Sequence, residues 1–70
     1  MSADIRITIN GEHRPFPAAP TVSELLATLQ LAGQRVAVEV NEDLVPRSEH
    51  PTHQLRDGDR VEIVRAIGGG

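Results

Sequence analysis

The sequence predicts an α+β fold in which one helix packs across a mixed sheet of four or five strands. The prediction rests on several stretches with alternating apolar side chains, one amphipathic stretch with helical spacing, and turn signals between them. The chain has 70 residues, 39% of them apolar, which suffices for one small domain with a single core. One Phe without Trp or Tyr means that this core is aliphatic.

The opening segment predicts a β-hairpin. Isoleucine stands at every second position of residues 5–9, the period of a strand that is buried on one face. Asn10-Gly11 follows, and both residues tolerate the positive φ angles that a type I′ turn needs. The returning stretch, residues 12–17, contains two prolines. Because proline cannot donate to a sheet ladder, we expect an edge strand with Phe16 facing inward.

The segment 20–33 predicts a helix with both ends marked. Thr21 as N-cap and Glu24 at the third helical position form a capping box, in which each side chain pairs with a backbone N–H of the other residue. We expect Gly33 to end the helix, since glycine adopts the left-handed conformation easily. A stripe of apolar residues with helical spacing faces the sheet: Val22, Leu25, Leu26 and Leu29.

The middle of the chain predicts two further strands. Valine stands at every second position of residues 36–40, so we expect a third strand with one apolar face. The polar residues 41–43 predict a turn, in which Asn41 is suited to a left-handed conformation. A short strand around Leu44 follows and is ended by Pro46.

The last third of the chain predicts a loop and a closing strand. Residues 48–59 are polar and predict an irregular loop with a helical turn at 51–54. Residues 60–67 predict the last strand, with Val61 and Ile63 facing the core. A helical crossover after the opening hairpin favours a parallel pairing that involves this hairpin, with the last strand lying between earlier ones. This architecture is the β-grasp, the ubiquitin-like roll.

Composition and charge exclude several classes of function. The net charge of −3 is spread along the chain, and all seven basic residues are arginines, so the basic face that nucleic-acid binding needs is not expected. Without cysteine, the chain has no disulfide and no thiolate nucleophile or metal ligand. No apolar run approaches the roughly 20 residues that cross a bilayer. We therefore expect a cytoplasmic protein, monomeric when alone, that binds neither nucleic acid nor membrane.

The polar side chains offer no convincing catalytic or metal site. His50 and His53 could supply two metal nitrogens, but no third ligand is evident, so we expect no bound metal. Ser23 and Ser48 have no base placed beside them in sequence, so neither is expected to act as a nucleophile. We also expect no stably bound cofactor.

Four stretches of the sequence resemble the sulfur carrier protein of thiamine biosynthesis, the ThiS family. They read ITINGE, TVSELLATL, VAVEVNEDLVPR and LRDGDRVEIVRAIGGG, and the resemblance spans residues 5–70. The pattern VN-x-x-x-VPR combined with a terminal diglycine carries most of its specificity. The resemblance implies the β-grasp fold and a protein that serves as a substrate for enzymes rather than as an enzyme.

The resemblance also implies a reaction at the C-terminal glycine. In the family, an adenylyltransferase related to ubiquitin E1 uses MgATP to adenylate this carboxylate. Sulfur from a persulfide donor system then replaces AMP, and thiazole synthase receives the thiocarboxylate. Mapped onto this chain, the reacting carbon belongs to Gly70, Gly69 is the penultimate glycine, and Gly68 is an additional one. Residues 1–67 would form the β-grasp domain and 68–70 a flexible glycine tail.

Further residues are candidates for partner binding. Gly68 and Gly69 lack Cβ atoms and could pass through a narrow channel, and three extended residues reach at most about 10 Å. Val64 and Ala66 lie on the face of the last strand opposite to the core. They form either an exposed docking patch or a surface that the strand's own surroundings cover. Arg47 in the VPR motif is either an ordinary surface arginine or a contact to the activating enzyme or the synthase.

Three alternatives stay open beside this interpretation. The small subunit of molybdopterin synthase shares the fold, the ending and the sulfur chemistry. It typically carries an aromatic residue and a Pro-Pro pair before its terminal glycines, where this chain has Arg65-Ala66-Ile67. A ubiquitin-like modifier that forms amide bonds to other proteins is the second alternative. A plain binding module with an inert tail is the third.

Overall fold

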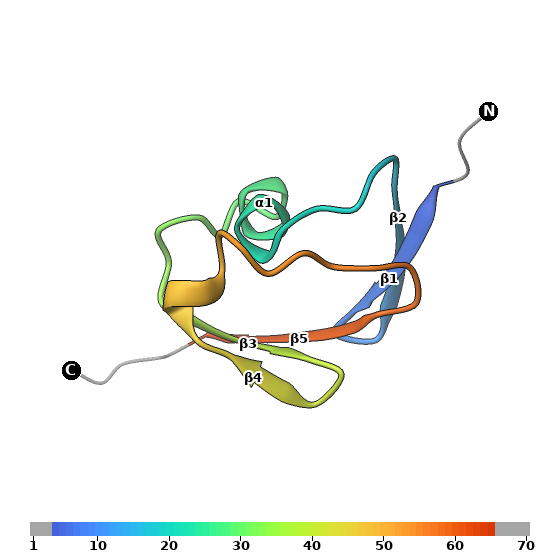
Figure 1. Ribbon diagram of the computed structural model, residues 1–70. Helices are drawn as coiled ribbons and strands as arrows, with labels where there is room; N and C mark the ends of the chain where they lie inside the picture. The colour runs from blue at the N-terminus through green and yellow to red at the C-terminus, as the bar shows by residue number, and fades with distance from the viewer. Residues whose placement is uncertain (1–3, 66–70) are drawn as a thin grey trace.

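One helix lies across one face of a five-stranded mixed sheet (Figure 1). The structure, a computed structural model, describes residues 4–65. The sheet order is β2-β1-β5-β3-β4, so the predicted α+β class and β-grasp architecture are confirmed. The elements are β1 Ile5–Ile9, β2 Glu12–Phe16, α1 Val22–Thr28, β3 Val36–Val40, β4 Asp43–Val45, the 3₁₀ turn η1 Arg47–Glu49, and β5 Arg60–Arg65.

The strand β5 occupies the centre of the sheet. It pairs in parallel with β1 and antiparallel with β3, and two antiparallel hairpins, β1-β2 and β3-β4, flank it. Both predictions about topology are confirmed, because the parallel pairing involves the first hairpin and β5 lies between earlier strands. The prediction of an edge strand for the segment after the first turn is confirmed as well, since β2 lies at one edge of the sheet. The sheet is continuous only when β5 is in place.

The two hairpins turn through dipeptides in which both residues have positive φ angles. These angles are 49° at Asn10 and 86° at Gly11 in the first turn, and 51° at Asn41 and 74° at Glu42 in the second. Both turns therefore have the φ signs of type I′, the turn that matches the twist of a hairpin. The left-handed conformations predicted for Asn10 and Asn41 are confirmed. Glu42 lacks the short polar side chain that helps Asn to adopt this conformation, so its left-handed conformation costs about 1 to 2 kcal/mol.

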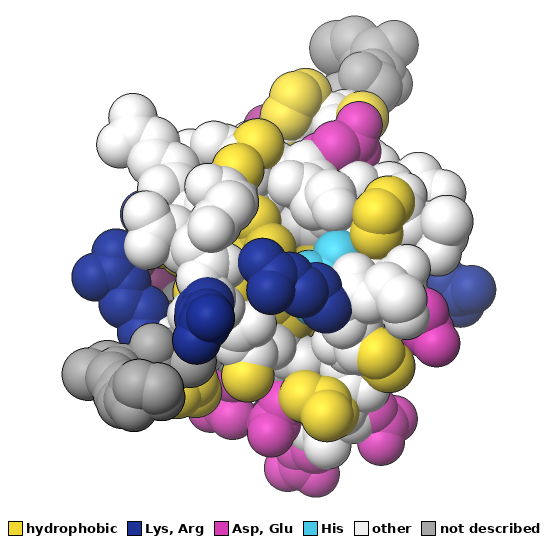
Figure 2. Space-filling model, turned by 90° about the vertical axis from the view of Figure 1, so that its left-hand side faces the viewer, with side chains coloured by type: hydrophobic (Ala, Val, Ile, Leu, Met, Phe, Trp, Pro, Cys, Tyr) yellow, Lys and Arg dark blue, Asp and Glu magenta, His cyan; other side chains and the backbone are white. Residues whose placement is uncertain are grey.

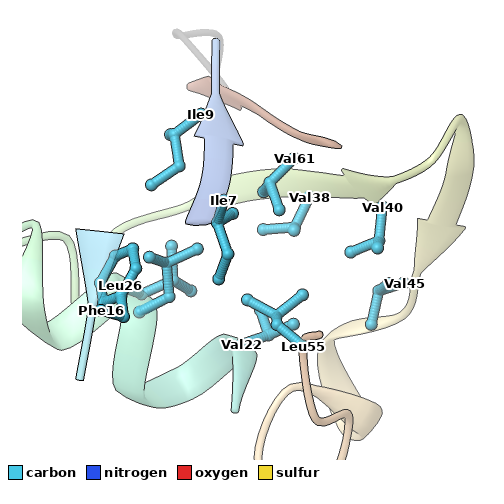
Figure 3. Packing of buried hydrophobic residues seen from close by; sticks show 11 residues of the cluster. Ile7, Ile9, Phe16, Val22, Leu26, Val38, Val40, Val45, Leu55 and Val61 are labelled. Atoms are coloured by element: carbon cyan, nitrogen blue, oxygen red, sulfur yellow. The ribbon is translucent and has the colours of Figure 1, made fainter. Parts of the chain in front are cut away.

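The core is aliphatic and lies between the sheet and one stripe of α1 (Figure 3). Ile7 and Val38 from the sheet and Leu25 from the helix are fully buried. Phe16 brings the edge strand β2 into the same buried cluster. The cluster consists of Ile7, Ile9, Phe16, Val22, Leu25, Leu26, Val38, Val40, Val45, Leu55 and Val61, with Ile63 partly buried against it.

The start of α1 agrees with the sequence. The Thr21 hydroxyl accepts a hydrogen bond from the Glu24 N–H at 3.1 Å, and the Thr21 N–H donates to the Glu24 carboxylate at 2.8 Å. This is the predicted capping box, and it satisfies two N–H groups that the first turn of a helix leaves unpaired.

The end of α1 differs from the prediction. Gln30, and not Gly33, takes the left-handed conformation that ends the helix, with φ 62°. The Leu31 N–H donates to the Leu26 carbonyl at 2.7 Å and the Gln30 N–H donates to the Ala27 carbonyl at 3.0 Å, the pattern of a Schellman motif. Leu31 packs against the core. The helix therefore ends before Gly33, and the partly buried Leu31 side chain packs against the core at this end.

The connection between β4 and β5 is also more structured than the sequence predicts. Its helical turn is η1, which follows Pro46 directly, and not residues 51–54. Pro46 is the N-cap of this turn and has a φ angle of −60°. Its carbonyl accepts a hydrogen bond at 2.8 Å from the N–H of Glu49, the last residue of η1. Leu55 is fully buried in the core. The prediction of a polar loop is therefore confirmed for most of the segment, whereas Leu55 and His50 attach it to the packed fold.

Candidate functional site

The strand β5 leads from the centre of the sheet toward the glycine segment. Arg65 is its last residue, and the predicted site residues Ala66, Gly68, Gly69 and Gly70 lie outside the described part of the chain. The structure therefore describes the surfaces around the end of β5, from which the candidate site is built.

Val64 lies on the face of the sheet that α1 does not cover. Its side chain is 62% exposed, so the alternative in which its surroundings cover it is wrong for the described residues. Ala37 pairs with Val64 across β3 and β5, and Leu44 on β4 is 65% exposed on the same face. We call Ala37, Leu44 and Val64 the outer patch. Glu39 and Glu62, directly opposite each other, share this face.

A groove opens on the helix side of the sheet, at the end to which β5 runs. Its volume is about 520 Å³, and its walls include Leu29, Leu31 and Ile63. Arg14 and Arg65 also line it. Figure 2 faces this end of the molecule and shows basic side chains gathered over hydrophobic ones, whereas several acidic side chains lie at the lower edge of the view. Asn10 and Glu12 complete the polar part of the lining, and the Glu12 carboxylate lies 3.9 Å from the Arg14 guanidinium. The end of β5 thus lies beside aliphatic side chains, two arginines and one carboxylate.

Arg47 lies near the same end of the molecule. It is exposed in η1 and lines a second hollow of about 230 Å³ together with His50 and Leu31. Leu31 lines both hollows, so the hollow beside Arg47 adjoins the groove beside Arg14 and Arg65. Its position is compatible with a partner contact close to the end of β5.

The two histidines connect the β4–β5 segment to the rest of the fold. The His50 ring is buried, and its Nε2 atom lies 3.2 Å from the Val45 carbonyl oxygen. The His50 carbonyl accepts a hydrogen bond from the Ser23 N–H at 3.0 Å, and the His53 carbonyl accepts one from the Val22 N–H at 2.9 Å. Among the described residues, no three side chains are grouped as metal ligands.

Sequence reasoning missed two asparagine side chains that hold β5. The Oδ1 atom of Asn10 accepts from the Ile63 N–H at 2.8 Å, and its Nδ2 group donates to the Ile63 carbonyl at 3.2 Å. The Oδ1 atom of Asn41 accepts from the Arg60 N–H at 2.9 Å, and its Nδ2 group donates to the Asp59 carboxylate at 3.0 Å. The available signal was that each hairpin turn begins with asparagine.

A β-grasp sheet whose central strand leads into three glycines defines a ubiquitin-like protein. A family model described as the ThiS family matches residues 7–70. The chain therefore belongs to the ThiS family, the sulfur carriers of thiamine biosynthesis. Within the described residues, no helix has the length and apolar character to span a membrane. A cytoplasmic location stays a prediction.

Similar proteins support this assignment over nearly the whole chain. The sulfur carrier protein ThiS of Thermus thermophilus is 39% identical, covering 91% of this chain and 98% of the relative. The structure of the thiamine biosynthesis protein ThiS from Geobacter metallireducens superimposes with a TM-score of 0.81 at 32% identity, covering 94% of this chain and 100% of the other. A thiazole synthase of Paramagnetospirillum magneticum is 46% identical over 94% of this chain. The matched region makes up only 20% of the length of that thiazole synthase.

Proposed function

We propose that the chain carries sulfur as a thiocarboxylate on Gly70 and delivers it to thiazole synthase for the thiazole moiety of thiamine. The observation that supports this proposal most directly is the family match, which extends through the glycines to residue 70. The structure supports it further, because the strand that precedes these glycines in sequence is the central strand of the sheet and pairs with β1 and β3.

The proposed chemistry begins with activation of the carboxylate. One Gly70 carboxylate oxygen attacks the α-phosphate of ATP, and pyrophosphate leaves with the electron pair of the broken P–O bond. Mg²⁺ in the activating enzyme neutralises the phosphate charge. The product is an acyl-adenylate, whose AMP group leaves far more readily than an oxide ion would from a free carboxylate.

Sulfur transfer then follows at the same carbon. A sulfur nucleophile from a persulfide donor attacks the acyl carbon, the C–O bond to AMP breaks, and AMP takes the electron pair. Attack by the terminal sulfur of a persulfide joins Gly70 to the donor cysteine through an acyl disulfide. A second thiol of the donor system then reduces this disulfide, which releases the thiocarboxylate and leaves a disulfide on the donor. Every catalytic group in this scheme belongs to the partner enzymes, so the carrier acts as a cosubstrate.

The thiazole synthases among the similar proteins support the choice of acceptor. The chain matches about a fifth of the length of two such proteins, so a ThiS-like region occurs in one polypeptide with a protein named thiazole synthase. We propose that this chain makes the corresponding contact with a thiazole synthase as a separate partner. The similar proteins named above all point to thiamine and thus favour this acceptor over molybdopterin synthase.

Intact-mass analysis of the protein from its own cells tests the proposal. We expect a species heavier than the unmodified chain by the difference between sulfur and oxygen, with the change located at Gly70 by fragmentation. The matched control is Gly69→Val, whose added β-branched side chain should prevent the tail from entering the activating enzyme. Target peptides joined through an isopeptide bond would instead indicate a modifier. Unmodified protein alone, under conditions in which thiamine is made, would contradict the carrier role.

A further inference from the structure

We propose that Asn10 is a positioning residue, whose carboxamide fixes the end of β5 and thereby the direction in which the chain leaves the sheet toward Gly68–Gly70. The contact itself is independent of the proposed function. Its consequence for activation of the carrier rests on that function.

The role of Asn10 follows from the spacing of the β1–β5 ladder. The Thr8 N–H donates to the Asp59 carbonyl at 3.0 Å, and the Asn10 N–H donates to the Val61 carbonyl at 2.9 Å. A parallel ladder that continued in this register would next pair the backbone of β1 with both polar groups of Ile63. The chain cannot continue it, because the left-handed turn that starts at Asn10 directs the backbone away from β5.

The Asn10 side chain supplies the two groups that the ladder lacks. Its Oδ1 atom accepts from the Ile63 N–H at 2.8 Å in place of a backbone carbonyl, and its Nδ2 group donates to the Ile63 carbonyl at 3.2 Å in place of a backbone N–H. On the other side, β3 holds β5 as far as Arg65 through the pair with Val36. With Asn10, β5 is held on both sides close to the point where it ends.

Few residues could perform this role. The position needs a residue that tolerates the φ angle of 49°, which favours Gly, Asn and Asp. Glycine lacks the carboxamide, and an ionised Asp offers only acceptors. Asn combines the backbone conformation with one donor and one acceptor at the right reach.

The end of β5 matters because two surfaces and the tail meet there. Val64 belongs to the outer patch on one face of the sheet, and Arg65 lines the groove on the opposite face. The five residues that follow can span at most about 18 Å, so the position and direction of the end of β5 set the region that Gly70 can reach relative to both surfaces. An enzyme that holds a surface of the carrier and the tail together binds best when this relation is fixed in advance.

The test compares Asn10→Gly with Asn41→Gly. Both variants keep a residue that accepts the positive φ angle, and both remove an asparagine side chain that bonds β5. Asn10 acts at the tail end, on Ile63, whereas Asn41 acts at the opposite end, on Arg60. Asn41→Gly is therefore the control: it also loses two side-chain hydrogen bonds and gains a flexible glycine. It keeps the two hydrogen bonds between Asn10 and Ile63 near the end of β5.

Backbone amide order parameters from NMR test the contact without any enzyme. We expect them to fall at Val64 and Arg65 in Asn10→Gly and to stay at wild-type values there in Asn41→Gly. Unchanged order at both residues in Asn10→Gly would overturn the proposal, whatever the function of the protein.

Steady-state adenylation by the E1-related enzyme and MgATP tests the consequence. We expect Asn10→Gly to raise KM for the carrier about threefold to tenfold and to change kcat less than about twofold, while Asn41→Gly leaves both near wild type. Equal changes in KM for the two variants would show a general stability effect and overturn the positioning role. Absence of adenylation with wild-type protein would contradict the proposed function, while the NMR comparison would still decide the role of Asn10.

Discussion

Three residues of the two hairpin turns that are not glycine adopt left-handed backbone conformations. Asn10 and Asn41 adopt positive φ angles and gain hydrogen bonds to β5 from this geometry. Glu42 adopts a φ angle of 74° at an exposed position of the second turn. Its backbone therefore carries the cost of a left-handed residue, and the turn would accept glycine there as readily as the first hairpin does at Gly11.

The variant Glu42→Gly should be more stable than the wild type by about 0.5 to 1 kcal/mol, because relief of left-handed strain exceeds the extra chain entropy that glycine brings to the unfolded state. Chemical denaturation at neutral pH measures the difference. The control is Asp43→Gly, which places glycine in β4 and should destabilise the fold. A lower midpoint for Glu42→Gly would show that the side chain makes a compensating contribution.

The exposed side chain of Val64 allows a test of partner binding. We predict that Val64→Asp raises KM for adenylation at least about fivefold, since it places a charge where an apolar contact is expected and adds to the acidic pair on the same face. The melting temperature should fall only slightly, because the side chain is 62% exposed.

The conservative variant Val64→Thr keeps the β-branched shape and is the control for that experiment. We expect it to raise KM less than Val64→Asp does. Wild-type adenylation kinetics in Val64→Asp would remove Val64 from the binding surface and leave the groove and Arg47 as the remaining candidates.

The helix α1 depends at the element scale on the capping of its first turn. It has only seven residues, fewer than an isolated helix needs for stability in water. We predict that Thr21→Ala lowers the free energy of unfolding by about 1 kcal/mol, as expected for a lost N-cap. Thr28→Ala is the matched control, since the Thr28 hydroxyl bonds only to the Glu24 carbonyl within the helix. It should be neutral or slightly stabilising, and equal losses would contradict the cap assignment.

The elements that the sequence predicted correctly are those with local signals. The capping box at Thr21 lies within one helical turn, and the isoleucines of β1 alternate within five residues. The end of α1 could not be predicted in this way, because Gln30 takes the left-handed conformation although glycine stands three residues later, and Leu31 packs against residues that are distant in sequence. The same reason applies to Asn10, whose partner Ile63 lies 53 positions away. Short stretches of sequence do not encode such contacts.

The candidate site was predictable to a similar extent. The outward position of Val64 followed from the period of β5, and its exposure agrees with the docking patch that the period suggested. The groove beside Arg65 combines residues from β1, β2, β5 and the end of α1, so only the assembled fold shows it. The roles of Gly68, Gly69 and Gly70 stay predictions from the family resemblance.

The whole molecule relies on the β4–β5 connection, which lies outside the sheet and α1, to close its core. Leu55 lies in the β4–β5 connection and is fully buried, whereas Leu44 is 65% exposed on β4. We predict that Leu55→Ala costs about 2 to 5 kcal/mol of stability, through lost burial and the cavity that remains. Leu44→Ala should change stability by less than about 0.5 kcal/mol. Equal effects of the two substitutions in thermal or chemical denaturation would contradict the assignment of the connection to the core.

The central strand of the sheet is also the last strand in the sequence. The two hairpins that flank β5 can therefore pair with it only after the rest of the chain has been made. The inner edges of β1 and β3 remain unpaired until β5 lies between them, and unpaired edges invite association with other chains. The strand that completes the sheet is the one that leads to the glycines. A chain that stops before β5 therefore lacks both a continuous sheet and the glycines, so every chain that carries the glycines also carries the strand that joins its two hairpins.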